Sequence, residues 1–332
     1  MLHSPEFLKK VMALYRVRLS RIGYAGVVAG MLFIQHSAVS LTGGKDLPAD
    51  DIGAKASVAL YYEGNQICGG VVYKDRYILT TAHCFTDGKG NLELEADDIQ
   101  VLYWSSGKAK RDARTVEAIV IHENYLFQEG ETARLLDQAW NFDNFPVNHE
   151  DIAVLKLNAP HPAGAISAFV SGIDNEYTGS KGNDTWFYMY GSSVNGIPGR
   201  LQRALVGQYG LLDRVIPGKT PDPFYTVRQM TIIPSENGFD KNISQCHGDS
   251  GSGVFLVASN GARYEEETEN FPDGIQLKEG LPIVVGLVEG HPITDVGQMN
   301  ARCGRDVKAV GFRATRVDYY HDWILSKLSE PQ

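Results

Sequence analysis

Three short strings in this 332-residue chain carry side chains that could move protons and attack a carbonyl group. His83 stands in the string TTAHC, Asp151 opens an apolar run, and Ser250 lies in the string GDSG. A serine hydroxyl is a weak nucleophile until a neighbouring base takes its proton. An imidazole can be that base near neutral pH, and a carboxylate can orient the imidazole. The three residues are therefore candidates for the nucleophile, the general base and the orienting acid of one site.

Each of these residues also has a purely structural interpretation. His83 could lie at the edge of a core, Asp151 could cap a strand, and Ser250 could belong to a glycine-rich turn. The turn is the hardest to explain by structure alone, because glycine at 248 and 251 exposes the hydroxyl between them and frees main-chain amides. The order His, Asp, Ser is the order of the β-barrel version of this chemistry, which also occurs in other orders on unrelated folds. Together the strings favour nucleophilic acyl transfer.

The segments that must position these residues have the period-two apolar pattern of short strands bounded by turns. A first series of expected strands covers 57–62, 71–73, 77–80, 101–104, 118–122 and 152–157. A second series covers 186–189, 204–206, 227–233, 254–257, 283–288 and 314–317. Many short strands at this spacing predict an all-β sandwich or barrel. Between the series, 158–182 is expected to be a linker, and helical periodicity occurs at 132–140 and 318–328.

With its three strings, the chain resembles the trypsin-like serine proteases of the chymotrypsin family over about residues 41–328. Further matching motifs are LTGG at 41–44, CGG at 68–70, TRV at 315–317 and DWI at 322–324. The resemblance implies an all-β fold of two six-stranded antiparallel β-barrels packed together with a C-terminal helix. It places the protease domain at 41–332, with the first barrel at 41–158, the second barrel at 183–317 and the C-terminal helix at 318–328.

The resemblance also implies an oxyanion hole and a specificity pocket. The main-chain N–H groups of Gly248 and Ser250 would form the oxyanion hole. Ser244, six residues before Ser250, would lie at the base of the pocket. An uncharged base cannot compensate a buried substrate cation, so we expect an uncharged residue on the acyl side of the cleaved bond. The string EGH at 289–291 stands where the family usually has Ser-Trp-Gly. Other expected substrate-binding positions are His247, Glu289, Gly290, His291 and Phe312.

The four cysteines predict disulfides rather than a metal site. Four cysteines allow three pairings, among which the sequence alone does not choose. The resemblance implies that Cys68 pairs with Cys84 and Cys246 with Cys303. The spacings match no Cys/His zinc pattern, and the acidic stretch 263–274 is interpreted as a solvated loop rather than a calcium site. We therefore expect no metal and no cofactor.

Residues 1–40 differ from the rest of the chain and are typical of a secretory signal peptide. Basic residues precede the uncharged run 22–34, and the small residues Ala38 and Ser40 occupy cleavage positions. A membrane anchor is the weaker interpretation, because this run of 13 residues is shorter than the roughly 20 that span a bilayer. We expect a secreted or periplasmic protein that begins at Leu41 and has no membrane attachment after cleavage. By resemblance, the new N-terminal ammonium of Leu41 would pair with Asp249 as an activation pair.

The charge balance bears on partners. Thirty-one Lys plus Arg against 40 Asp plus Glu give a net charge of −9, which argues against nucleic acid as a partner. We expect a monomer that acts on a peptide or protein substrate as a serine endopeptidase, through an acyl-enzyme intermediate. The alternative is a catalytically inactive binding protein on the same scaffold, but the chain retains His83, Asp151 and Ser250. The segments 126–150 and 259–280 are interpreted as insertions that either narrow the cleft or form passive loops.

Overall fold

The computed structural model describes parts of the chain between residues 41 and 329, and the predicted signal peptide at 1–40 lies outside the described residues. The described residues are 41, 44–47, 50–87, 91–105, 108–125, 150–170, 186–194, 197–208, 229–234, 246, 248–257, 277–289, 293–294 and 309–329. All of them belong to one compact unit, Ala38–Gln332. The expected helix at 132–140 and most of both expected insertions lie outside these ranges. Within the described part, no helix has both the length and the apolar character needed to cross a bilayer.

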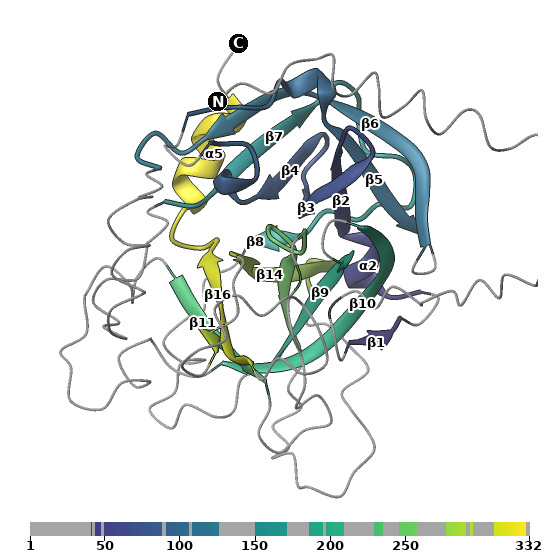
Figure 1. Cartoon of the computed structure of the whole chain (residues 1–332), viewed down its shortest axis with the longest axis vertical. Coiled ribbons are helices and arrows are strands. Elements are labelled where there is room, and N and C mark those ends of the chain that lie inside the picture. The colour runs from purple at the N-terminus through teal and green to yellow at the C-terminus, as the bar shows by residue number, and fades with distance from the viewer. Residues whose placement is uncertain are drawn as a thin grey trace, which may run out of the picture. The chain divides into compact units, whose positions relative to one another are not determined.

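The first half of the described chain forms a closed six-stranded antiparallel barrel (Figure 1). Around the barrel the strands are β2 (Ser57–Tyr62), β3 (Asn65–Tyr73), β4 (Tyr77–Thr80), β7 (Ala153–Leu157), β6 (Lys108–Ile121) and β5 (Gln100–Ser105). Between β4 and β7 the pairing register places Thr80 opposite Ala153. His83 follows the end of β4 and Asp151 precedes the start of β7, so the register brings both residues to the same end of the barrel.

The strands β2, β4 and β7 of this barrel are largely buried on both faces, whereas β6 is more exposed. Alternate residues of a strand point to opposite faces. Val58 and Leu60 of β2 belong to the apolar cluster inside the barrel, while Ala59 and Tyr61 belong to a second cluster. That second cluster also contains residues of the second half of the chain: Tyr188, Tyr190, Leu205, Phe255, Val284 and Leu287. It therefore packs the outer face of the barrel against the second half.

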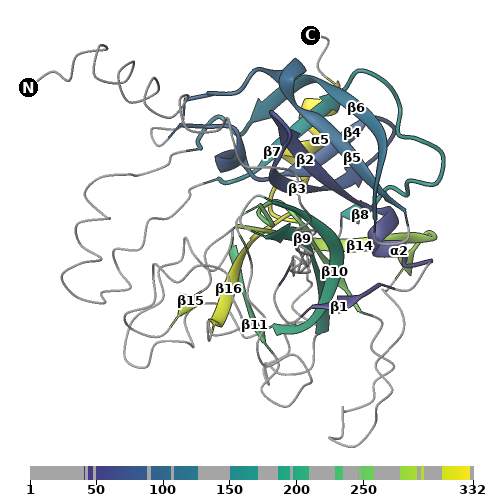
Figure 2. The same ribbon diagram turned by 45° about the vertical axis from the view of Figure 1, so that its right-hand side comes forward.

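The second half forms a ten-stranded sheet. Its long strands are β9 (Trp186–Val194), β10 (Ile197–Gln208), β11 (Gln229–Pro234), β12 (Gly253–Leu256), β14 (Leu281–Val288) and β16 (Ala309–Arg316). The short strands β1 (Lys45–Asp46), β8 (Phe169–Val170), β13 (Leu277–Lys278) and β15 (Ile293–Thr294) join it (Figure 2). The order is β13-β14-β12-β9-β10-β11-β16-β15, with β1 on β10, β8 on β14 and a further pairing of β14 with β16.

The second half is one ten-stranded sheet rather than the predicted separate six-stranded barrel: four two-residue strands add to its six long strands, and β14 pairs with both β12 and β16. The β8 strand illustrates the reason. It lies in the stretch 158–182 that composition assigned to a linker, yet it pairs in parallel with β14, and its Val170 is buried, as is the preceding Ala168. Two residues carry too little periodicity to be recognised as a strand, and only the neighbouring strand determines their conformation. The β1 strand likewise joins the N-terminal segment to β10.

The helices are short, and each follows from a local signal. The C-terminal helix α5 (His321–Ser329) lies within three residues of its predicted start, with Ile324 fully buried and Trp323 packed against the core. The helix α2 (Ile52–Lys55) begins after Asp51, whose carboxylate accepts a hydrogen bond from the N–H of Ala54 as an N-cap. The described residues also contain two 3₁₀ turns, η1 (Ala82–Cys84) and η2 (Ala96–Asp98), and η1 carries His83.

Candidate active site

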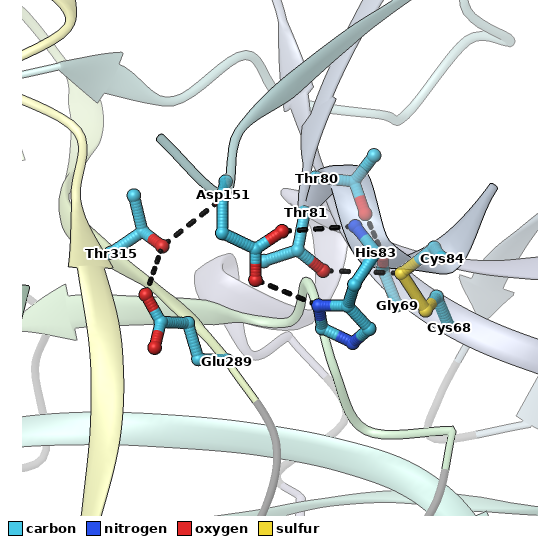
Figure 3. A network of polar contacts seen from close by, with 9 residues as sticks. All are labelled: Cys68, Gly69, Thr80, Thr81, His83, Cys84, Asp151, Glu289 and Thr315. Atoms are coloured by element: carbon cyan, nitrogen blue, oxygen red, sulfur yellow. Dashed lines mark hydrogen bonds and ion pairs between the residues drawn. A yellow bond between two sulfur atoms is a disulfide. The ribbon is translucent and has the colours of Figure 1, made fainter. Parts of the chain in front are cut away.

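His83 and Asp151 are joined by two hydrogen bonds at the end of the first barrel (Figure 3). The ring Nδ1 of His83 lies 2.7 Å from Oδ2 of Asp151, and the main-chain N–H of His83 donates to Oδ1 at 2.9 Å. The Asp151 side chain is fully buried, whereas 23% of the His83 side chain is exposed. A buried carboxylate that binds both the ring and the main chain of the histidine fixes the ring orientation and places the ring proton on Nδ1.

The turn before β7 positions Asp151. Glu150 has a positive φ of 59°, and the N–H of Ile152 donates to the Glu150 carbonyl at 2.7 Å. Left-handed backbone is rare for residues other than glycine and marks a turn that the surrounding structure imposes. The hydroxyl of Thr315, on β16, lies 3.0 Å from the carbonyl oxygen of Asp151. Asp151 is thus held by a local turn and by a strand of the second half.

A disulfide bond braces the turn that carries His83. Cys68 of β3 is bonded to Cys84, as the resemblance implied. The bond spans 16 residues, and closing a loop of about 15 residues stabilises a fold by roughly 3 kcal/mol in the entropic model. The ring of His83 and both sulfurs lie within 4.8 Å of one another, but bonded sulfurs are not thiolate ligands for a metal.

The turn that carries Ser250 packs directly on the strands that lead to His83. The N–H of Gly69 donates to the Ser250 carbonyl at 2.7 Å. Gly251 has a φ of 79°, and a Cβ at that position would lie 2.2 Å from Oγ1 of Thr80 and 2.5 Å from the Gly69 carbonyl oxygen. A side chain at 251 would therefore push the turn away from β3 and β4. The glycine that the sequence places after the serine permits this close approach.

The comparison with known families bears directly on this geometry. Residues 43–263, more than half of the chain, match the family model described as Trypsin. The chain belongs to the trypsin family. The matched range contains His83, Asp151 and Ser250, and family membership brings the trypsin fold with it.

The chain is also similar to individual proteins at 27–28% identity. Trypsin beta of Drosophila erecta is 27% identical over 228 residues, which cover 65% of this chain and 76% of the relative. Trypsin delta of the same fly is 27% identical over 210 residues, covering 60% of this chain and 70% of the relative. Transmembrane protease serine 11G of the mouse is 28% identical over 113 residues, covering 34% of this chain and 22% of the relative.

Asp249, next to the predicted nucleophile of this trypsin-family chain, is fully buried. Its carboxylate accepts hydrogen bonds from the N–H of Ser192 at 2.8 Å and from the N–H of Cys246 at 2.9 Å. The side-chain amide of Gln66 donates to the Gly248 carbonyl at 3.0 Å and to the Ser192 hydroxyl at 2.7 Å. Gln66 is 1% exposed and links β3 to the loop of the predicted oxyanion hole. Sequence reasoning missed Gln66 and Ser192, because neither lies in a recognisable motif.

Some of the remaining predicted site residues lie in the described part of the chain, and the others lie outside it. Leu41 is fully buried in the apolar cluster of the second half, with Phe187, Met189 and Val254. Cys246 is disulfide-bonded, and the main chain of Phe312 pairs with Ile232. Outside the described residues lie Ser244, His247, Gly290, His291 and Cys303.

Glu289 brings a second carboxyl group close to Asp151. It directly follows β14, is 5% exposed, and has its Oε1 atom 2.9 Å from the Thr315 hydroxyl. Burial and the nearby carboxylate of Asp151 raise the pKa of the Tyr125 hydroxyl well above its ordinary value, and Glu289 lies close enough to influence the same hydroxyl. All three groups therefore share one buried region. The sequence suggested a pocket wall at Glu289, and the structure adds that this side chain points toward Thr315.

Proposed function

We propose that the protein is a serine endopeptidase that uses His83, Asp151 and Ser250 as its catalytic triad. The observation that supports this best is the doubly hydrogen-bonded His83–Asp151 pair, next to which the Ser250 turn packs on Gly69 and Thr80. A structural histidine needs no buried carboxylate on both its ring and its main chain. A catalytic histidine needs this arrangement, because its tautomer must be fixed before it can accept a proton.

The proposed reaction has two halves. With its Nδ1 proton bound to Asp151, the His83 ring presents Nε2 as an acceptor for the hydroxyl proton of Ser250. The serine oxygen attacks the peptide carbonyl, and the N–H groups of Gly248 and Ser250 stabilise the resulting oxyanion. His83 then returns the proton to the leaving amine, which leaves an acyl group on Ser250. Water, deprotonated by His83, attacks this ester, releases the acid and regenerates the hydroxyl.

Hydrolysis of a peptide library by the purified protein tests this proposal. Ser250→Ala should lower kcat by a factor on the order of 10⁶, the size of the effect of removing the nucleophile of a serine protease. The matched control is Ser252→Ala. It also removes a buried serine hydroxyl from this turn, but it should retain activity. If the folded wild-type protein bound peptides without cleaving them, the chain would instead be an inactive binding protein on this scaffold.

We further propose that the cleaved bond follows an uncharged residue. The support is Ser244 at the position six residues before the nucleophile, where no carboxylate would be available to neutralise a substrate cation. Matched peptides that differ only at the acyl-side residue measure this directly. We expect kcat/KM for alanine, leucine or phenylalanine to exceed that for lysine or arginine, and fastest cleavage after lysine or arginine would refute the specificity but not the triad.

Export and activation form one linked proposal. We propose that a signal peptidase cuts after Ser40, so that the ammonium group of Leu41 pairs with Asp249. The buried side chain of Leu41 and the buried carboxylate of Asp249 support this, since a buried carboxylate is stabilised by a cation. N-terminal sequencing of the exported protein should begin at Leu41. Adding one alanine before Leu41 should abolish activity, and full activity of that variant would contradict the pairing.

A further inference from the structure

Thr315 connects the orienting carboxylate of the proposed triad to a second, buried carboxyl group. Its hydroxyl lies 3.0 Å from the main-chain carbonyl oxygen of Asp151 and 2.9 Å from Oε1 of Glu289. Thr315 is 1% exposed and Glu289 is 5% exposed. In Figure 3, Thr315 and Glu289 lie on one side of Asp151, and His83 lies on the other. The side chain of Glu289 therefore lies on the side of Asp151 that faces away from His83.

The single hydroxyl hydrogen of Thr315 limits how its two contacts can be satisfied at the same time. A threonine hydroxyl has one hydrogen to donate, and a main-chain carbonyl oxygen can only accept. When Thr315 donates to the carbonyl of Asp151, its contact with Glu289 is a hydrogen bond only if the glutamate supplies the proton. Both contacts are therefore satisfied together when Glu289 is a neutral carboxylic acid.

The surroundings of Glu289 favour the same neutral form. Burial disfavours a carboxylate, and the nearby carboxylate of Asp151 disfavours a second negative charge. Described titratable groups near Asp151 and Glu289 include the Tyr125 hydroxyl, His83 on the far side of Asp151, and Glu150 beside Asp151. The guanidinium of Arg316, next to Thr315, binds the carboxylate of Asp318 in a two-pronged contact.

We propose that Glu289 is a positioning residue for the triad: as a neutral acid it donates to Thr315, which donates to Asp151 and holds it against His83. This inference rests on the proposed hydrolytic function. When Glu289 loses its proton at alkaline pH, the hydroxyl of Thr315 turns toward the new carboxylate and its bond to Asp151 breaks. The turnover number therefore falls with an ionisation that belongs to Glu289.

Two pairs of variants test the chain of hydrogen bonds. Glu289→Gln keeps a neutral side chain of the same shape that can donate but does not ionise. Thr315→Val removes the hydroxyl at nearly constant shape, and Thr315→Ser restores it. We expect Thr315→Val to lose about tenfold in kcat with KM unchanged, as expected when a positioned group is misaligned. Thr315→Ser should recover the wild-type kcat.

The decisive readout is the ratio of the kcat of Glu289→Gln to the wild-type kcat between pH 6 and pH 10. The inference predicts that this ratio rises with pH along a single ionisation. A flat ratio, or a loss of more than about tenfold at pH 7 in Glu289→Gln, overturns it, because the latter result means that the carboxylate form is needed.

A measurement without substrate separates this inference from the proposed function. The ¹³C resonance of the Glu289 carboxyl group, assigned by its absence in Glu289→Gln, should report a protonated acid at pH 7 in the full chain. The proton on Nδ1 of His83 should shift in Thr315→Val and return in Thr315→Ser. An ionised Glu289, or an unchanged His83 proton, overturns the inference. If both signals behave as expected while the protein fails to cleave any peptide, the proposed function fails instead.

Discussion

Two aspartates of this protein have buried side chains but differ in their partners: one binds an arginine and the other binds a histidine. The Asp51 side chain is 1% exposed and binds Nη1 of Arg203 at 2.6 Å, the Tyr190 hydroxyl at 2.7 Å and the N–H of Ala54 at 2.8 Å. The Asp151 side chain is fully buried and binds the ring and main chain of His83. Arg203 keeps its charge at all ordinary pH values, whereas an imidazole gains and loses a proton near neutral pH.

The difference teaches that burial of a carboxylate does not by itself indicate catalysis. The cluster around Asp51 has a permanent cation, and burial and Asp51 both raise the pKa of Tyr190, which keeps its hydroxyl a donor. That cluster attaches the segment before β2 to the strands β9 and β10. Asp151 has a partner that can change its charge, so the same degree of burial there can support proton transfer.

The same substitution at the two aspartates should have its largest effect on activity at Asp151. Asp151→Asn keeps the shape of the side chain but presents an amide to His83 and favours the wrong ring tautomer. We expect kcat to fall by about 10⁴, the size of this effect in a characterised Ser-His-Asp protease, while the free energy of unfolding changes little. Steady-state kinetics and urea unfolding measure the two quantities. A loss of stability that accounted for the lost activity would remove the distinction between the two sites.

Asp51→Asn should show the reverse pattern. It leaves the guanidinium of Arg203 without its anion, and breaking a buried ion pair costs about 3 kcal/mol of unfolding free energy. The kcat of the folded fraction should stay at the wild-type value. The matched control is Asp46→Asn, which breaks the exposed Arg200–Asp46 pair and should cost less than about 1 kcal/mol. Equal losses from the buried and exposed pairs would contradict this interpretation of the Asp51 cluster.

The smallest expected effect is on stability. It concerns the exposed carboxylate of Glu123, which binds the C-terminal helix α5. Partial burial alone would raise the pKa of Glu123, but hydrogen bonds from Lys327 and from the Trp323 indole N–H lower it to about 2, from an ordinary 4.5. Because the folded-state pKa is depressed, this contribution to stability is present above pH 4.5 and is lost as the pH falls toward 2.

The indole N–H resonance of Trp323 follows this change directly. It should titrate with an apparent pKa near 2 in the wild-type protein. It should not titrate there in Glu123→Gln. The unfolding free energies of the two proteins should converge as the pH falls from 5 to 2. A wild-type signal that titrates near 4.5 would show that Glu123 does not hold helix α5.

Local strings allowed the sequence to predict part of this structure. The strands β2 and β4 have their predicted bounds, and the register of β4 with β7 brings together His83 and Asp151, which the strings had singled out. The alternation of apolar residues and the serine flanked by glycines are local signals, because each is contained in a stretch of ten residues or fewer. The disulfide between Cys68 and Cys84 followed from the family resemblance, because cysteine count alone leaves three pairings.

Contacts between distant segments were not predictable in this way. Gln66 reaches Gly248 across 182 positions of sequence, and Arg203 reaches Asp51 across 152. Glu289 occupies a position where the resemblance suggested a pocket wall, and only the burial of its side chain against Thr315 shows its relation to Asp151. A single sequence contains no local signal for such pairs, because their energy depends on which strands the fold places side by side.

The central claim is that His83 activates Ser250 as a nucleophile, and covalent labelling tests it most directly. The purified protein would be treated with a fluorophosphonate and the modified peptide mapped by mass spectrometry. We predict one adduct, on the oxygen of Ser250, formed at the wild-type rate in Ser252→Ala and lost in His83→Ala. A folded wild-type protein that forms no adduct, or an adduct that forms equally fast without His83, would contradict the account.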